Sequence, residues 1–93
     1  MKSGCFLVNT SRGALIHESA LIAALKSGHV KAAALDVLSK EPPVDDNPLL
    51  HAKNCLVTPH NAWISREARE RIMQATVANI AGFLANKPVN IVN

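Results

Sequence analysis

Three short apolar runs in this chain each end in charged or titratable side chains. The runs are continuous rather than alternating in polarity, which is typical of strands covered on both faces, as in a parallel sheet. The first lies between Gly4 and Asn9, and the third is stopped by Pro59. The first run is residues 5–8, and Arg12 follows it. The second is residues 31–38, which contain Asp36 and lead to Glu41. The third is residues 55–58, which lead to His60.

Two segments have helical periodicity. Residues 18–27 carry four apolar side chains on one face, and Gly28 follows them as a typical C-terminal stop; His17 precedes them and is a poor N-cap. Residues 66–86 form a longer amphipathic pattern after Ser65, a good N-cap. The apolar stripe of this second helix consists of Ile72, Met73, Thr76, Val77, Ile80 and Leu84.

The order of these elements predicts an α/β fold with three parallel strands and helices. We expect one domain over residues 1–93, and a proline-rich loop over residues 41–50. Two features suggest an incomplete domain: the first strand starts close to residue 1, and the last helix is longer than a three-stranded sheet can cover. The predicted elements are strand 5–10, helix 18–27, strand 31–38, strand 55–58 and helix 66–86.

Composition narrows the function classes. The formal charge is only +3, and two Phe and one Trp are the only aromatic residues, so nucleic-acid binding rests on the cluster "REARER" alone and stays a weak alternative. Cys5 and Cys55 lie far apart in apolar surroundings without zinc-site spacing, which indicates two reduced thiols and no metal site. No signal peptide or membrane-spanning stretch is visible, so we expect a cytoplasmic protein away from membranes.

The charged endings should meet at one edge of the sheet. In open parallel sheets, ligands bind beyond the carboxyl ends of the strands, which places Arg12, Asp36, Glu41 and His60 along one rim. Each residue alone also has a plain structural interpretation: Arg12 as a surface cation, Glu41 as a loop charge, His60 as a turn residue. Together they have complementary chemistry, which favours a functional site.

That chemistry suits a small 2-hydroxy or 2-keto acid. An arginine offers a rigid fork for a carboxylate, and a histidine can pass a proton at neutral pH. A carboxylate beside the histidine fixes its tautomer. No side chain can move a hydride, so a nicotinamide cofactor is implied.

Three motifs carry a resemblance to a known family. "FLVNTSRG", "AALDVLSKEPP" and "VTPHNAW", in this order and spacing, closely resemble the D-isomer-specific 2-hydroxyacid dehydrogenases. "TPHNAW" followed by "SREARERIM" looks most like the glycerate dehydrogenase (hydroxypyruvate reductase) branch. The resemblance implies a substrate-binding Arg12, a Glu41 paired with histidine, and His60 as general acid/base. It implies cofactor contacts for Thr10, Ser11, Arg12, Asp36, His60, Asn61 and Ala62.

The resemblance also implies a partial Rossmann-like fold, the C-terminal half of a doubly wound dinucleotide-binding domain. The cofactor would be NAD or NADP and the substrate of the hydroxypyruvate or glyoxylate class. The phosphate-binding G-x-G-x-x-G turn is absent from the chain, so we expect the isolated chain to be inactive. Two residues depart from the family pattern. Asn61 stands where the family usually has an apolar residue or glycine, and His17 stands where it usually has a capping aspartate.

Two functions therefore stay open beside the weak nucleic-acid alternative. The chain is a fragment of a dehydrogenase, or it is a non-catalytic interaction or assembly module that reuses the half-domain. In either case we expect a homodimer, through the unpaired edge of the first strand or through exchanged C-terminal helices. The apolar side chains of Ile80, Phe83 and Leu84 support that expectation.

Overall fold

The computed structural model describes residues 1–92, which form two compact units. The first is Met1–Ala62, and the second begins at Trp63. All three strands lie in the first unit, and the long C-terminal helix lies in the second.

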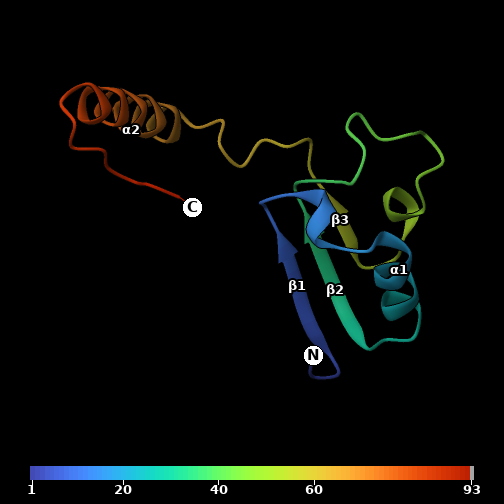
Figure 1. The fold of residues 1–93 in the computed structure, drawn as a ribbon. Coiled ribbons are helices and arrows are strands. Elements are labelled where there is room, and N and C mark those ends of the chain that lie inside the picture. Colours follow the sequence, from blue (N-terminus) through green and yellow to red (C-terminus); the bar gives the residue numbers. More distant parts are fainter. Residues whose placement is uncertain (93) are drawn as a thin grey trace. The chain divides into compact units, whose positions relative to one another are not determined.

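The first unit contains a parallel sheet of three strands in the order β1 (Cys5–Asn9), β2 (Val30–Leu35) and β3 (Cys55–Val57) (Figure 1). Asn9 lies opposite Leu35, and Leu35 lies opposite Val57. The three carboxyl ends are thus aligned at one edge of the sheet, as the sequence predicted. β1 is an edge strand of this sheet, which also agrees with the prediction.

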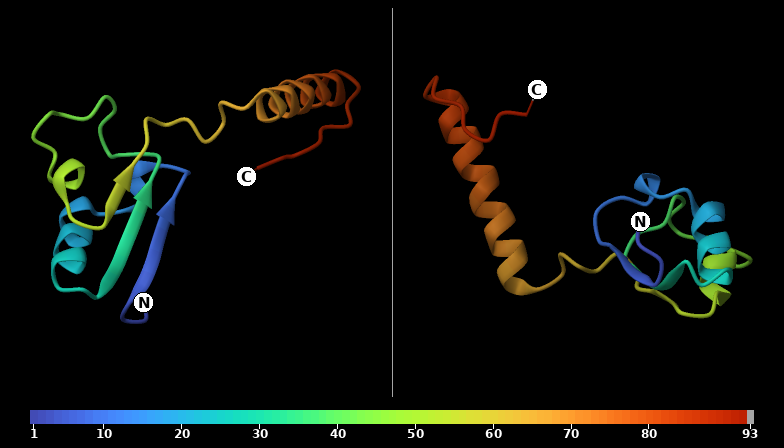
Figure 2. Two further views of the ribbon diagram at one scale, coloured as in Figure 1. Left: turned by 180° about the vertical axis from the view of Figure 1, so that it is seen from behind. Right: turned by 90° about the horizontal axis from the view of Figure 1, so that it is seen from below.

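One face of the sheet packs on α1 (Glu18–Lys26) and on the short 3₁₀ helix η2 (Pro48–His51) (Figure 2). The core on this side consists of Leu21, Val30, Ala33, Leu35, Leu38 and Leu49. Gly28 is the predicted stop of α1: it follows the C-cap Ser27 and has φ +75°, a conformation that costs glycine little. His17 is the N-cap and its side chain makes no capping hydrogen bond.

The other face of the sheet is open within residues 1–62. Phe6, Val8 and Leu56 on this face are 69%, 70% and 63% exposed. The prediction that continuous apolar strands are covered on both faces is therefore wrong for this unit, because α1 and η2 both lie on the same side. Nζ of Lys31 lies 5.6 Å from the centre of the Phe6 ring, which partly shields that ring from water.

Several elements are shorter than predicted. The strand predicted over residues 31–38 ends at Leu35, because the chain bends at Asp36, whose side chain binds the turn after β3. The loop over residues 41–50 contains the start of η2, which Asn47 caps by accepting a hydrogen bond from the N–H of Leu49 (2.9 Å). β1, α1 and β3 each end one residue before their predicted ends, and a further 3₁₀ helix, η1 (Gly13–Leu15), was not predicted.

The second unit is built on α2 (Arg66–Leu84). As predicted, the hydroxyl of Ser65 caps it by accepting a hydrogen bond from the N–H of Ala68 (3.1 Å). The helix ends two residues before the predicted residue 86, because Asn86 adopts φ 55° and Lys87 N–H donates back to Gly82 O (2.8 Å). No residue of α2 is buried, so its apolar stripe is exposed.

Candidate active site

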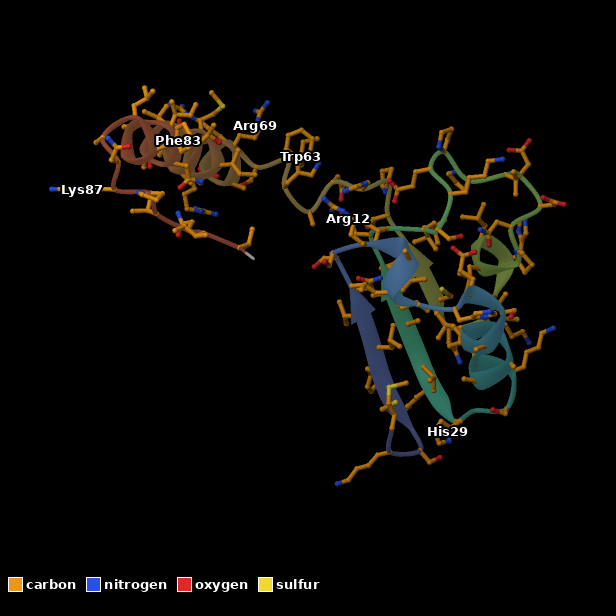
Figure 3. All side chains as sticks on the ribbon, viewed as in Figure 1. Arg12, His29, Trp63, Arg69, Phe83 and Lys87 are labelled. Carbon is orange, nitrogen blue, oxygen red and sulfur yellow. The ribbon has the colours of Figure 1, made fainter. Side chains whose placement is uncertain are left out.

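The predicted rim residues lie where the strands of the first unit end. Arg12 follows β1, Asp36 follows β2, and His60 follows β3. Figure 3 shows Arg12 at the end of the sheet to which the strands run, whereas His29 lies at the opposite end. Parallel pairing thus gathers side chains that are far apart in the sequence.

Arg12 lies in a turn that the Asn9 side chain stabilises with two hydrogen bonds. The buried Asn9 side chain accepts a hydrogen bond from Ser11 N–H (3.1 Å) and donates one to Arg12 O (2.8 Å). The Arg12 guanidinium is exposed and donates from Nη1 to Ser11 O (2.8 Å). Four of its five N–H donors are not used by that bond and can meet an anion.

Gly13 brings this turn against the loop that follows β2. A β-carbon on Gly13 would lie 2.0 Å from both the carbonyl carbon and the carbonyl oxygen of Leu38, and 2.4 Å from Ser39 N. Only a residue without a side chain fits between these backbones. Glycine at this position therefore allows Arg12 to lie beside the loop that carries Glu41.

Glu41 and His60 form a close pair. Nδ1 of His60 lies 2.6 Å from Oε2 of Glu41, and the two side chains are 39% and 36% exposed. Because an ionised carboxylate can only accept, Nδ1 carries the proton, and Nε2 is the nitrogen that can exchange a proton with a ligand. The hydrogen bond from His60, and then the one from Leu38 N–H (3.0 Å), lower the pKa of Glu41.

Asp36 holds the turn on which His60 lies. Its Oδ1 accepts from the Thr58 hydroxyl (2.5 Å) and from Asn61 N–H (2.9 Å), and its Oδ2 accepts from Ala62 N–H (2.8 Å). The Thr58 hydroxyl is the largest influence on the pKa of Asp36; burial opposes it, the two backbone donors reinforce it, and the pKa is lowered.

This clamp supports a strained backbone at the histidine. His60 has φ 53°, a left-handed conformation that costs an ordinary residue about 1–2 kcal/mol. Asp36 bonds residues on both sides of it, Thr58 before and Asn61 after. Strain of this kind persists where the surroundings hold it, and it is concentrated at functional sites.

One pocket joins the three predicted catalytic residues. A hollow of about 270 Å³ is lined by Arg12, Glu41 and His60, together with Gly13, Ala14, Val37, Leu38 and Ser39. A second, more apolar pocket of about 340 Å³ is also lined by Glu41 and His60, together with Pro42 and Leu50 among others. The first pocket is large enough for a small acid and lies just below the usual range of ligand-site volumes.

The predicted cofactor residues have different positions. Thr10 and Ser11 follow β1 and are exposed, whereas Asp36 is only 5% exposed. Asn61 and Ala62 direct their N–H groups to Asp36. Asn9, Gly13 and Thr58 also belong to the site and were not predicted. The sequence did contain two signs of these residues: a hydrogen-bonding side chain ends each apolar run, and a glycine directly follows Arg12.

A family comparison agrees with this geometry. Residues 1–62 match the model of the D-isomer specific 2-hydroxyacid dehydrogenase NAD binding domain. The chain belongs to this family. The match covers two thirds of the chain and ends at Ala62, where the first structural unit also ends. The expected partial Rossmann-like α/β fold is thereby confirmed.

Similar curated proteins include members of the branch that the sequence resembles. A hydroxypyruvate reductase of Blautia hydrogenotrophica is 54% identical over 93 residues, covering 100% of this chain and 29% of that protein. A glycerate dehydrogenase of Methylorubrum extorquens is 46% identical and covers 99% of this chain and 30% of that protein. The resemblance to this branch is confirmed, and the chain spans less than a third of the length of these relatives.

A solved structure shows the same fold. An acyclic imino acid reductase (Bsp5) in complex with NADPH and D-Arg is 43% identical with a TM-score of 0.81, covering 100% of this chain and 29% of that chain. At this identity the likeness extends from fold to sequence.

Residues 1–92 bear on two other kinds of site. They contain no group of three or more His, Cys, Asp or Glu side chains arranged to hold a metal ion. Among the same residues no helix has both the length and the apolarity needed to cross a membrane. Cys5 and Cys55 are free thiols, and burial raises the pKa of Cys55.

Proposed function

We propose that this chain supplies the catalytic half-site of an enzyme that interconverts small 2-keto acids and D-2-hydroxy acids with NAD or NADP. One observation carries the proposal: Arg12, Glu41 and His60 line a single pocket, with Nδ1 of His60 2.6 Å from Glu41. The substrate class we propose is hydroxypyruvate or glyoxylate, because the similar curated proteins include hydroxypyruvate and glyoxylate reductases.

Arg12 would bind the substrate carboxylate. Its guanidinium is a rigid fork of donors that matches two carboxylate oxygens, and its charge persists at all physiological pH values. The backbone that carries it is fixed by Asn9 and by the close contact of Gly13 with Leu38. The carboxylate would therefore lie at a defined distance from the histidine.

His60 would move the proton. In reduction, Nε2–H of the imidazolium gives its proton to the carbonyl oxygen of the keto acid while a hydride arrives at C2, so that C=O becomes CH–OH. In oxidation the neutral Nε2 takes the hydroxyl proton back. Glu41 accepts from Nδ1 throughout, which orients the ring.

The residues of this chain fit the nicotinamide end of the cofactor. Oδ2 of Asp36 accepts one bond in the structure, from Ala62 N–H, and retains a lone pair for an amide donor. When bound, the nicotinamide would supply or take the hydride. We propose cofactor contacts at Asp36, at Arg12 and His60, and along the backbone at Thr10, Ser11, Asn61 and Ala62.

A chimera tests the proposed function. This chain would replace the matching residues of the Blautia hydrogenotrophica hydroxypyruvate reductase, and oxidation of NADH or NADPH by hydroxypyruvate and glyoxylate would be followed by absorbance. We expect turnover with at least one of the two acids. A soluble, folded chimera that binds NAD(P)H and reduces neither acid would contradict the proposal.

We also propose that the chain forms homodimers, and that exchange of C-terminal helices is one way in which they form. The exposed apolar side chains of Phe6 and Val8 on the edge strand β1 support association, as do those of Ile80, Phe83 and Leu84 on α2. The same surfaces favour the alternative of an assembly module. The two unpaired cysteines support a reducing, cytoplasmic setting.

A further inference from the structure

Glu18, outside the pocket, connects α1 to both ends of the loop that carries Glu41. Its Oε1 accepts a hydrogen bond from Ser39 N–H (2.7 Å), 21 residues away in the sequence. Its Oε2 accepts one from Nδ2 of Asn47 (3.2 Å), 29 residues away. Glu41 lies between these two attachment points.

Burial does little to hold this loop. Residues 39–46 are all exposed, whereas Leu38 and Asn47 at its two ends are buried. Near its far end, Nε2 of His51 also lies 3.3 Å from Asp45 O. Hydrogen bonds at the two ends therefore hold the loop, together with those that Glu41 itself makes with Leu38 and His60.

The residues at the two ends of the loop also make other hydrogen bonds, which fix how they are oriented. Oδ1 of Asn47 caps η2 through Leu49 N–H (2.9 Å), so its amide must present Nδ2 to Glu18. Leu38, next to Ser39, contacts Gly13 and donates its own N–H to Oε1 of Glu41 (3.0 Å). Burial raises the pKa of Glu18, but the bonds from Ser39 and Asn47 outweigh burial and lower it, so the group is ionised.

We propose that Glu18 is a positioning residue: its carboxylate holds both ends of the loop 39–47 and thereby keeps Glu41 within hydrogen-bonding distance of His60. The consequence for catalysis rests on the proposed function, but the positioning itself is a property of this chain. Glu18 occupies the first position of α1, so the helix supplies a rigid support.

An exchange of hydrogen-bonding polarity tests the proposal. In Glu18→Gln, whichever way the new amide is turned, either Ser39 N–H or Asn47 Nδ2 loses its acceptor. Asn47→Asp alone places two carboxylates together. In the double variant the new amide at position 18 can donate to one oxygen of the new carboxylate at position 47, whose other oxygen still accepts from Leu49 N–H. Both contacts are then restored, and the total charge of the pair equals that of the wild type.

The measurement is the pKa of Glu41 in the 93-residue chain, followed through its side-chain carboxyl carbon by ¹³C NMR and assigned with Glu41→Gln. His60 and Asp36 are the titratable groups that act on Glu41, and neither is changed. Any direct effect of removing the Glu18 charge can only lower the pKa of Glu41, whereas a loosened bond to His60 raises it. The sign separates the two effects.

We expect the pKa of Glu41 to rise toward its ordinary 4.5 in Glu18→Gln and to return to the wild-type value in the double variant. Glu18→Asp keeps the charge but shortens the reach, and should give an intermediate rise even if Glu18→Gln does not fold. Glu67→Gln, on the first turn of α2, is the matched control and should change nothing. Amide exchange of β2 reports that each variant is folded.

Two results would overturn the proposal: an unchanged or lowered pKa of Glu41 in a folded Glu18→Gln or Glu18→Asp, or a double variant that fails to restore it. Neither result depends on turnover. Failure of the proposed function would appear separately, as a chimera that binds the cofactor but reduces neither acid.

Discussion

Gly13 and Leu38 approach each other so closely that a β-carbon on Gly13 would lie 2.0 Å from the Leu38 carbonyl carbon. This contact is between backbones, so neither partner can move aside by changing a rotamer. It joins the turn that carries Arg12 to the start of the loop that carries Glu41. Two parts of the proposed site therefore share one steric constraint.

Gly13→Ala should be severely destabilising. Overpacking usually costs about 1–3 kcal/mol, and here the obstacle is backbone, so we expect more than about 3 kcal/mol. The measurement is the midpoint of denaturant unfolding. Gly28→Ala is the control: nothing lies within 4 Å of its added β-carbon, and only the positive φ is unfavourable, which costs about 1–2 kcal/mol. Equal losses in the two variants would contradict the steric argument.

Stability should fall in acid. The pKa values of Glu18, Asp36 and Glu41 are all lowered in the folded chain, from ordinary values of 4.5, 3.8 and 4.5. A lowered pKa means that the unfolded chain binds protons first, so the stabilisation is complete above these ordinary values and is lost as pH falls through the lower folded ones. Denaturant midpoints between about pH 7 and about pH 2 measure the effect.

Asp36→Asn should reduce that pH dependence and destabilise the fold at neutral pH. An amide presents one oxygen and one NH₂ group, so it cannot accept from Thr58, Asn61 and Ala62 in the arrangement that the carboxylate uses. The control is Asp46→Asn in the exposed loop. If Asp36→Asn had the same acid profile as the wild type, Asp36 would not be the clamp of this turn.

His60→Ala should abolish most turnover in the chimera. Loss of a general acid/base lowers the chemical step by roughly a hundredfold to ten-thousandfold, with a smaller effect on cofactor binding. His29→Ala, at the opposite end of the sheet, should leave kcat unchanged (Figure 3). A near-normal rate in His60→Ala would remove His60 from the proposed role.

The isolated chain should not reduce hydroxypyruvate or glyoxylate with either cofactor. It has no G-x-G-x-x-G turn to bind the pyrophosphate, so little binding energy for a dinucleotide is available. Steady-state absorbance of the reduced nicotinamide measures this. Turnover that disappears in Arg12→Ala would show that the chain is an enzyme by itself.

The chain should sediment as a dimer at micromolar concentration, with twice its mass of 10.0 kDa. The apolar side chains on β1 and α2 are exposed, and association would remove them from water. Val8→Lys places a charge on the edge strand and should weaken a dimer formed through that edge. A compact wild-type monomer would contradict the assembly proposal.

The sequence by itself determined the strands, the caps and the rim. Continuous apolar runs predict strands of a parallel sheet because such side chains favour burial. Ser65 and Gly28 mark helix ends because their backbone requirements are local. The alignment of Arg12, Glu41 and His60 followed from one rule of parallel topology, and the pocket that they line agrees with it.

Only the tertiary structure decided how these side chains are held. Asp36 binds the turn after β3, Gly13 contacts Leu38, and Glu18 joins Ser39 to Asn47. Each of these contacts is between residues more than 20 apart in the sequence. No local pattern specifies such contacts, because they exist only once the strands are in register. For the same reason the open face of the sheet was missed: apolarity shows that a strand can be covered, whereas the packing of α1 and η2 on one side decides which face is.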